Sequence, residues 1–330
     1  GEAPDAKAFA ASNLKSQYQD EAILGVDKAW GDNWVTGAKV TYRKLQSAID
    51  DICDSARIAD KLEAQGVDPD SVIIPGCVIF NPGQTNSFSL ENVDGGRTDV
   101  TMSKKDWGFN KEAKREYLAV NLFVEHPFDG KWQGRVDYTW SRNFGNTEGQ
   151  LKSDIGQTDV SKTQDWDAAA IMAYAGGYLA NDRRHQLKFF GAYQIAPEWV
   201  VSSTLRVQSG TPKSCLGYFS VNGIDEGSTE GDPIGYRSSY HTCAGEASPP
   251  GKAGRTPWTK KLDLGVSYRP EFADKKLALN LQVFNALNEQ KPLQTDATFE
   301  NGPYTISNTY DMPLYYELPR YVQLSASYDF

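Results

Sequence analysis

The chain has 330 residues, of which 39% are hydrophobic and 12% are aromatic, and its formal net charge is −9. This acidic balance argues against nucleic acid as a partner, because binding to phosphate backbones requires clustered Lys and Arg. No run of about 18 apolar residues occurs, so the sequence contains no candidate transmembrane helix. Residues 168–180 form the longest apolar tract, and their two central glycines suit a packed loop or a short helix.

Apolar and polar residues alternate with a period of two along much of the chain, which predicts β-strands. In WTKKLDLGVSY, for example, Leu262, Leu264 and Val266 fall on one face, and Lys261 and Asp263 fall on the other. Nine segments show the pattern: residues 21–29, 34–44, 117–125, 132–140, 185–195, 199–207, 258–268, 277–285 and 321–330.

These strands fit two architectures. In a soluble β-sandwich the apolar face packs against a second sheet, whereas in an outer-membrane barrel it faces lipid. Aromatic residues such as Trp132 and Trp140 crowd the strand ends, and the opposite face carries charge or Ser and Thr at nearly every step. Aromatic girdles and a polar interior are typical of membrane barrels.

The connections between the strands favour the barrel as well, because short and long ones alternate. The short connections are residues 31–33, 129–131, 196–198 and 273–276, and the long ones are about 46–113, 146–182, 213–257 and 293–318. Outer-membrane barrels have short periplasmic turns and long external loops. The sequence therefore predicts an all-β fold, a transmembrane antiparallel β-barrel with long extracellular loops.

Nine is an odd number of strands, whereas single-chain bacterial barrels have an even number. We therefore expect residues 18–330 to form the C-terminal portion of a larger barrel, and residues 1–17 to be the remnant of an extracellular loop. The alternation of loops places the C-terminus at the periplasmic rim. It also predicts that the last strand runs to the final residue, Phe330.

Several stretches resemble the C-terminal barrel of TonB-dependent outer-membrane receptors, in particular the Oar-like branch. They are GYLANDRRHQLKFFGAYQI (177–195), RVQSGTP (206–212), RTPWTKKLDLGVSYRP (255–270) and LALNLQVFNALNE (277–289). The resemblance implies a barrel of about 22 strands around an N-terminal plug. It also implies import of a bound substrate across the outer membrane of a Gram-negative bacterium, without a cofactor.

The partners implied by the resemblance are the plug and the missing strands, the TonB complex, the barrel-assembly machinery, and lipid with lipopolysaccharide. The terminal aromatics Tyr328 and Phe330 resemble the signal that the assembly machinery recognises. The plug and the TonB-contacting segment are not in this sequence. Two alternatives therefore stay open: an outer-membrane adhesion or binding protein without import, and a secreted soluble β-sandwich that binds glycans.

No catalytic, cofactor or metal site is predicted, and we do not expect an enzyme. The three histidines, His126, His185 and His241, lack metal-ligand spacing. No GxGxxG or GxSxG motif occurs. DRRH (182–185) could hold an anion, but we favour a strand end whose arginines meet loop carboxylates or lipid phosphates.

Charged residues on the predicted inner face are the candidates for contact with substrate or plug. They are Arg43, Arg135, Asp137, Lys188, Arg206 and Asp263. In the first long loop, residues 49–66 predict a short helix that ends at Gly66, with Ile52, Ala56 and Leu62 at helical spacing.

The four cysteines all lie in predicted loops. Cys53 and Cys77 share the first long loop, and Cys215 and Cys243 share the third. Of the three possible pairings, one keeps both bridges within single loops. An even count in external loops suits maturation in an oxidising compartment, so we predict the disulfides Cys53–Cys77 and Cys215–Cys243.

Overall fold

The computed structural model describes residues 5–149, 151–156, 163–218, 232 and 234–330. Parts of the predicted N-terminal remnant and of the second and third long loops lie outside these residues. Among the described residues, no helix has the length and apolar composition needed to cross a membrane.

Nine long strands form one antiparallel sheet in which each strand pairs with the next one along the chain. They are β1 (Tyr18–Trp30), β2 (Trp34–Ser47), β8 (Arg115–His126), β9 (Trp132–Gly145), β11 (His185–Ala196), β12 (Trp199–Gln208), β15 (Thr259–Tyr268), β16 (Leu277–Phe284) and β21 (Tyr321–Tyr328). A short strand, β10 (Gly177–Tyr178), pairs with the end of β9. All nine predicted strands are confirmed.

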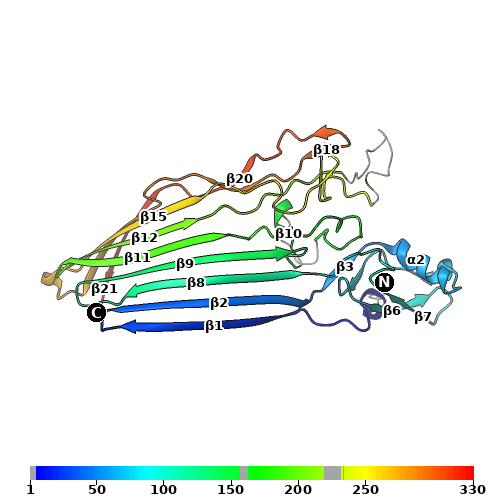
Figure 1. Cartoon of the computed structure of the whole chain (residues 1–330), viewed down its shortest axis with the longest axis horizontal. Helices are drawn as coiled ribbons and strands as arrows, with labels where there is room; N and C mark the ends of the chain where they lie inside the picture. The colour runs from blue at the N-terminus through cyan, green and yellow to red at the C-terminus, as the bar shows by residue number, and fades with distance from the viewer. Residues whose placement is uncertain (1–4, 150, 157–162, 219–231, 233) are drawn as a thin grey trace.

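The two ends of this sheet differ. Figure 1 shows the short turns together at the end where the C-terminus lies, and the long loops together at the opposite end. We name the long loops in chain order: loop 1 between β2 and β8, loop 2 between β9 and β11, loop 3 between β12 and β15, and loop 4 between β16 and β21.

The strand register keeps the predicted apolar face continuous across the sheet. Neighbouring apolar pairs on this face include Val26–Ala38, Leu122–Tyr138, Leu187–Val207, Leu205–Leu262 and Leu281–Leu324. Leu24 is 80% exposed and Leu324 is 78% exposed, so this face is not the interior of a sandwich. An uncovered apolar face of this extent is what a lipid-facing barrel wall presents.

Aromatic residues mark both ends of the apolar face. On β9, Trp132 and Trp140 lie eight residues apart on this face, which is about 27 Å along an extended strand. With the usual tilt of roughly 40° this corresponds to about 20 Å across a membrane, close to the apolar band of known barrels. The Trp132 ring stacks on His126 with their centroids 3.8 Å apart.

Loop 1 folds into a module with its own core. It contains β3 (Asp50–Ile52), α2 (Ser55–Ala64), η1 (Pro69–Ser71), β4 (Val72–Ile73), β5 (Val78–Phe80), β6 (Asn86–Asn92) and β7 (Arg97–Met102). The N-terminal segment with α1 (Ala6–Phe9) packs on it, and Ala11 joins its core. The short strands escaped the sequence analysis because each has only two to seven residues.

The predicted helix of loop 1 is present as α2, and Gly66 follows it with a φ of +76°. Its buried face differs from the prediction, because Ile58 and Leu62 are the buried residues while Ala56 is exposed. Ile52 does not belong to the helix and lies in β3. The larger side chains of Ile58 and Leu62 bury more apolar area than alanine can, which decides which face turns inward.

In loops 2 to 4, the residues that the structure describes form short elements. They are η2 (Ser153–Ile155), β13 (Thr242–Cys243), β14 (Glu246–Ala247), β17 (Pro292–Thr295), β18 (Glu300–Gly302), β19 (Thr305–Ile306) and β20 (Pro313–Tyr316), while η4 (Glu271–Ala273) lies in a turn. Residues 168–180 form a packed loop, as predicted, with Ile171 fully buried.

The end of the chain differs from the prediction. β21 ends at Tyr328, so Phe330 lies two residues beyond the strand and is fully exposed. Its partner strand β16 starts at Leu277, and the last backbone contact is from the Asp329 N–H to the Lys276 carbonyl at 3.0 Å. Beyond that contact β16 offers no residue with which the chain could pair.

Candidate functional site

The six candidate residues for substrate or plug contact all lie on the face opposite the apolar one. Across the sheet, Asp137, Lys188, Arg206 and Lys261 are successive neighbours on β9, β11, β12 and β15. Arg135 and Asp263 belong to the adjacent row, separated by Phe190 and Thr204. Arg43 lies farther away on β2, beside Tyr117.

Arg135 is the centre of an ion-pair network on this face. Its Nη2 lies 2.8 Å from Asp137 Oδ1, and its Nη1 lies 2.7 Å from Glu125 Oε2 on the neighbouring strand. Its guanidinium also lies over the Phe123 ring, 4.1 Å from the centroid. Glu125 was not among the predicted residues, although the alternation in 117–125 places it on the inner face.

In the part of the sheet that the structure describes, the inner face has paired charges on β8 and β9 and unpaired positive charges on β11, β12 and β15. Asp137 and Glu125 satisfy Arg135, whereas Lys188, Arg206 and Lys261 make no ion pair with any described residue. Arg43 pairs with Glu21, and Asp263 accepts a 2.8 Å hydrogen bond from the Asn285 N–H. Cations without partners on β11, β12 and β15 provide a surface for carboxylate or phosphate groups.

A second cluster of charged residues lies at the junction of the loops. Lys152 and Asp165 of loop 2 are almost completely buried and pair at 2.8 Å. Burial raises the pKa of Asp154, and burial lowers the pKa of His241 well below its usual range. His241 is therefore neutral at neutral pH. A cavity of about 150 Å³ borders this cluster, and its wall includes Asp154, Lys213 and Ser214.

Two further acids extend the junction to loop 1. Burial raises the pKa of Asp50 to about 9, and burial raises the pKa of Asp167 to about 7. The Cys53 N–H donates to the Asp167 carbonyl at 2.9 Å. None of these acids was a predicted site residue, because they are far apart in the sequence and follow no local motif.

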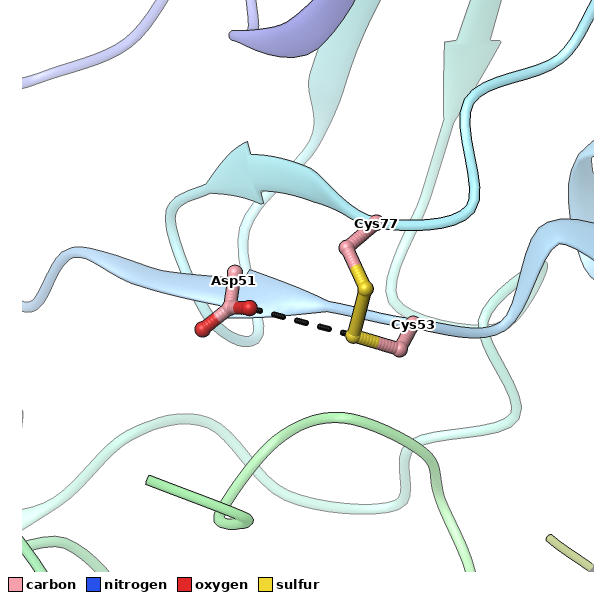
Figure 2. Close-up of side chains that lie close together, drawn as sticks. All are labelled: Asp51, Cys53 and Cys77. Carbon is pink, nitrogen blue, oxygen red and sulfur yellow. Dashed lines mark hydrogen bonds between the residues drawn. A yellow bond between two sulfur atoms is a disulfide. The ribbon is translucent and has the colours of Figure 1, made fainter. Parts of the chain in front are cut away.

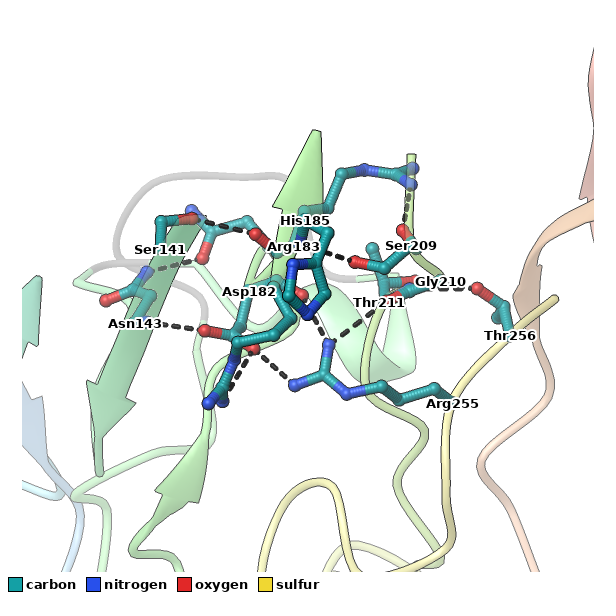
Figure 3. Close-up of polar contacts among 12 residues, drawn as sticks. Ser141, Asn143, Asp182, Arg183, His185, Ser209, Gly210, Thr211, Arg255 and Thr256 are labelled. Carbon is teal, nitrogen blue, oxygen red and sulfur yellow. Dashed lines mark hydrogen bonds and ion pairs between the residues drawn. The ribbon is translucent and has the colours of Figure 1, made fainter. Parts of the chain in front are cut away.

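Asp182 of the DRRH segment anchors the loops to the strand ends (Figure 3). Its carboxylate accepts from the Asn143 N–H at 2.5 Å, pairs with Arg255 of loop 3, and lies 3.5 Å from Arg184. Arg255 also donates to the Gly210 carbonyl at 3.0 Å. The segment is thus a strand end whose arginine meets a carboxylate, and that carboxylate is its own Asp182.

Both predicted disulfides are present, and they close segments with sequence separations of 24 and 28 residues. Figure 2 shows the Cys53–Cys77 disulfide beside Asp51. Asp51 Oδ2 lies 3.8 Å from the Cys53 sulfur. These three residues are the only described group with the spacing of metal ligands. Because both sulfurs are joined in the disulfide, they are not available as thiolate ligands.

The three histidines lie apart from one another, and each packs against other protein side chains. His126 stacks on Trp132, and His185 Nδ1 lies 2.8 Å from the Tyr138 hydroxyl. His241 is buried in the loop junction. Each ring therefore contacts a different part of the molecule.

Comparison with known proteins adds to this geometry. No family model matches the chain. Over 292 residues the chain is 26% identical to the TonB-dependent transporter Oar of Myxococcus xanthus. The matched region covers 87% of this chain and 22% of that protein. The outer-membrane transporter YddB of Escherichia coli has a similar structure, with a TM-score of 0.52 and 15% identity over 96% of this chain and 33% of that one.

The chain thus spans about a fifth of the length of the curated relative that it matches. Its antiparallel sheet has the fold of part of an outer-membrane transporter barrel. In sequence and in fold the chain is similar to TonB-dependent outer-membrane transporters, Oar among them, as the resemblance in its sequence predicts.

Proposed function

We propose that this chain forms the C-terminal portion of the barrel of a TonB-dependent receptor that imports a bound substrate across the outer membrane. The observation that carries the proposal is the sheet of nine long strands with one continuous apolar face and one charged face, combined with the similarity to Oar over 87% of the chain. The similar proteins are transporters, which supports a role other than catalysis.

The edges of the sheet support a larger barrel. Every residue of β1 and of β21 is exposed, and the outer edge of each strand has no partner strand among the described residues. Unpaired backbone groups in lipid are costly, so further strands have to pair with both edges. In this proposal those strands and a plug domain belong to the same protein, and the C-terminus lies in the periplasm.

The inner-face cations are the proposed contacts for substrate or plug. Lys188, Arg206 and Lys261 form a row without carboxylate partners, so an acidic group of the plug or of the substrate can pair with them. Asp137 and Arg135 already neutralise each other, and we assign them a supporting role in this network.

A growth experiment tests import. Strains that lack the natural protein, or that lack TonB, are compared on peptides, glycans, siderophores and cobalamin-like compounds. We expect both strains to lose uptake of the same class of compound, and the natural gene to restore it in the first strain. Loss of surface attachment with unchanged uptake of every class would instead identify an adhesion protein.

A fractionation experiment tests membrane insertion separately. The natural protein should sediment with outer membranes and require detergent for extraction. Recovery in solution without detergent would contradict the barrel and favour the secreted glycan-binding alternative. The exposure of Leu24 and Leu324 on the apolar face argues for the first result.

A further inference from the structure

The outward, apolar face of the sheet changes character toward the loops. On β8 and β9, Val120 pairs with Trp140, and the next outward pair toward the loops is Leu118 with Arg142. One step farther, Lys44, Glu116, Phe144 and Tyr178 form a row across β2, β8, β9 and β10. Beyond the apolar residues, aromatic and charged residues are therefore mixed on this face, the composition expected where a membrane barrel passes from the hydrocarbon interior to the headgroups.

Three arginines surround the ring of Tyr178 in this last row, at the loop end of the sheet. Their guanidinium carbons lie 5.7 Å (Arg142), 4.9 Å (Arg184) and 5.6 Å (Arg255) from its centroid. Arg142 also lies 4.8 Å from the centroid of the Phe144 ring. Such cation–π contacts hold the guanidinium planes in place while their N–H groups stay available.

The carboxylates nearby do not neutralise these cations. The buried carboxylate of Asp182 forms ion pairs with both Arg184 and Arg255, so one negative charge is shared between two positive charges. Arg142 is exposed and makes no ion pair with any residue that the structure describes. One side of this arginine cluster is therefore an unsatisfied anion-binding surface.

A groove of about 540 Å³ continues the surface past Phe144. Its wall contains Lys44, Lys104, Lys111 and Lys114, while Leu45 and Ala113 contribute apolar area. Glu112 pairs with Lys104 at 3.3 Å and Glu116 pairs with Lys114 at 3.1 Å. Lys44 and Lys111 have no carboxylate partner in the described part of the chain, although the whole chain carries a net charge of −9.

We propose that this surface, formed by the arginines around Tyr178 and the lysines of the groove, binds the phosphate groups of an anionic glycolipid in the outer leaflet. Arginine forks and lysine ammonium groups are the side chains that bind phosphate. The surface adjoins the lipid-facing apolar rows, so a phosphate carried by a lipid reaches it from within the membrane. The groove between the lysines has room for the sugar of such a headgroup.

This inference rests on the membrane placement in the proposed function, and the test separates the two. The natural protein and the variants Arg142→Gln, Lys44→Gln and their double variant are purified in detergent. The binding of lipopolysaccharide to each of these proteins is then measured by titration. Lys131→Gln is the matched control, because Lys131 lies 5.5 Å from the Tyr193 centroid at the opposite, short-turn end. Heat-dependent mobility in gels verifies that each variant has folded as a barrel.

We expect each of the two substitutions to weaken binding about fivefold and the control to leave it unchanged, since one cation at a membrane surface contributes on the order of 1 kcal/mol. Glycolipid from which the phosphates have been removed should bind the natural protein as weakly as lipopolysaccharide binds the double variant. Inorganic phosphate should compete only at much higher concentration.

Equal binding by the double variant and the control would overturn the inference, as would equal affinity for the dephosphorylated glycolipid. Competition by inorganic phosphate at concentrations similar to those of the glycolipid would also overturn it, because the site would then be one for free anions. If the protein requires detergent for extraction but gives any of these contradicting binding results, only this inference is refuted. A protein soluble without detergent refutes the proposed function itself.

Discussion

The Tyr236 hydroxyl donates a 2.6 Å hydrogen bond to Asp167 Oδ2, which joins loop 3 to loop 2. The backbone carbonyl of the same Asp167 accepts from the Cys53 N–H of loop 1 at 2.9 Å. Asp167 Oδ1 is buried and has no hydrogen-bond partner among the described residues. This one residue of loop 2 therefore contacts both loop 1 and loop 3, and its carboxyl group lies in an environment that disfavours the ionised form.

The packing of these loops should depend on pH. Burial, with Asp51 and Asp165 nearby, raises the pKa of Asp167 to about 7, although Tyr236 and Lys152 oppose the rise. An acid whose folded pKa exceeds its unfolded value binds more protons when folded, so stability falls as pH rises between the two values. Between about pH 4 and pH 7, rising pH should therefore loosen residues 163–180. Hydrogen exchange, corrected for its intrinsic pH dependence, measures this.

The variant Asp167→Asn should lose the part of that pH dependence that Asp167 contributes, because its amide oxygen still accepts from Tyr236 but does not ionise. The part contributed by Asp50, whose pKa burial raises to about 9, should remain. Asp99→Asn is the control, since Asp99 is exposed on β7 of loop 1. If Asp167→Asn keeps the full pH response of the natural protein, another group is responsible.

The core of loop 1 should be sensitive to cavities. Leu62 of α2 is completely buried, so Leu62→Ala should destabilise the module by about 2–5 kcal/mol. We expect faster proteolysis of loop 1 in the intact natural protein, with unchanged barrel folding. The control Ile73→Ala removes a side chain that is 53% exposed and should change the rate little. Equal proteolysis of both variants would contradict this core.

The disulfide of loop 3 should order that loop. Cys215 and Cys243 enclose a segment with a sequence separation of 28 residues, for which chain entropy predicts a contribution of about 3–4 kcal/mol. The double variant Cys215→Ser, Cys243→Ser should be cleaved faster in loop 3, whereas loop 1 should keep its natural rate. Peptide mapping without reduction checks the pairing, and peptides that link loop 1 to loop 3 would refute it.

The terminal aromatic should matter for assembly rather than for sheet packing. Phe330 is fully exposed and contacts Tyr328 edge to face, with 5.5 Å between ring centroids. Deleting Phe330, or changing it to Asp, should lower the outer-membrane yield of the natural protein severalfold. Ser325→Ala and Ser327→Ala change the opposite face of β21 and should leave the yield unchanged. Normal yield without Phe330 would exclude recognition of this residue.

The strands and their two faces could be predicted from the sequence alone. Because side chains alternate along a strand, the positions of Leu262, Leu264 and Val266 determine their common face before any neighbour is known. The same alternation places Lys188 and Arg206 on the opposite face, where the register makes them neighbours. The cysteine pairing followed as well, because only one arrangement keeps each bridge within a loop.

The loops were decided by tertiary contacts. Asp182 and Arg255 are 73 residues apart and meet because they precede β11 and β15, which lie on either side of β12 in the sheet. Ala11 and Trp166 share the core of loop 1 although neither belongs to that loop. Such contacts follow no short-range period: a loop's fold depends on which distant apolar and charged groups the strand ends bring within reach.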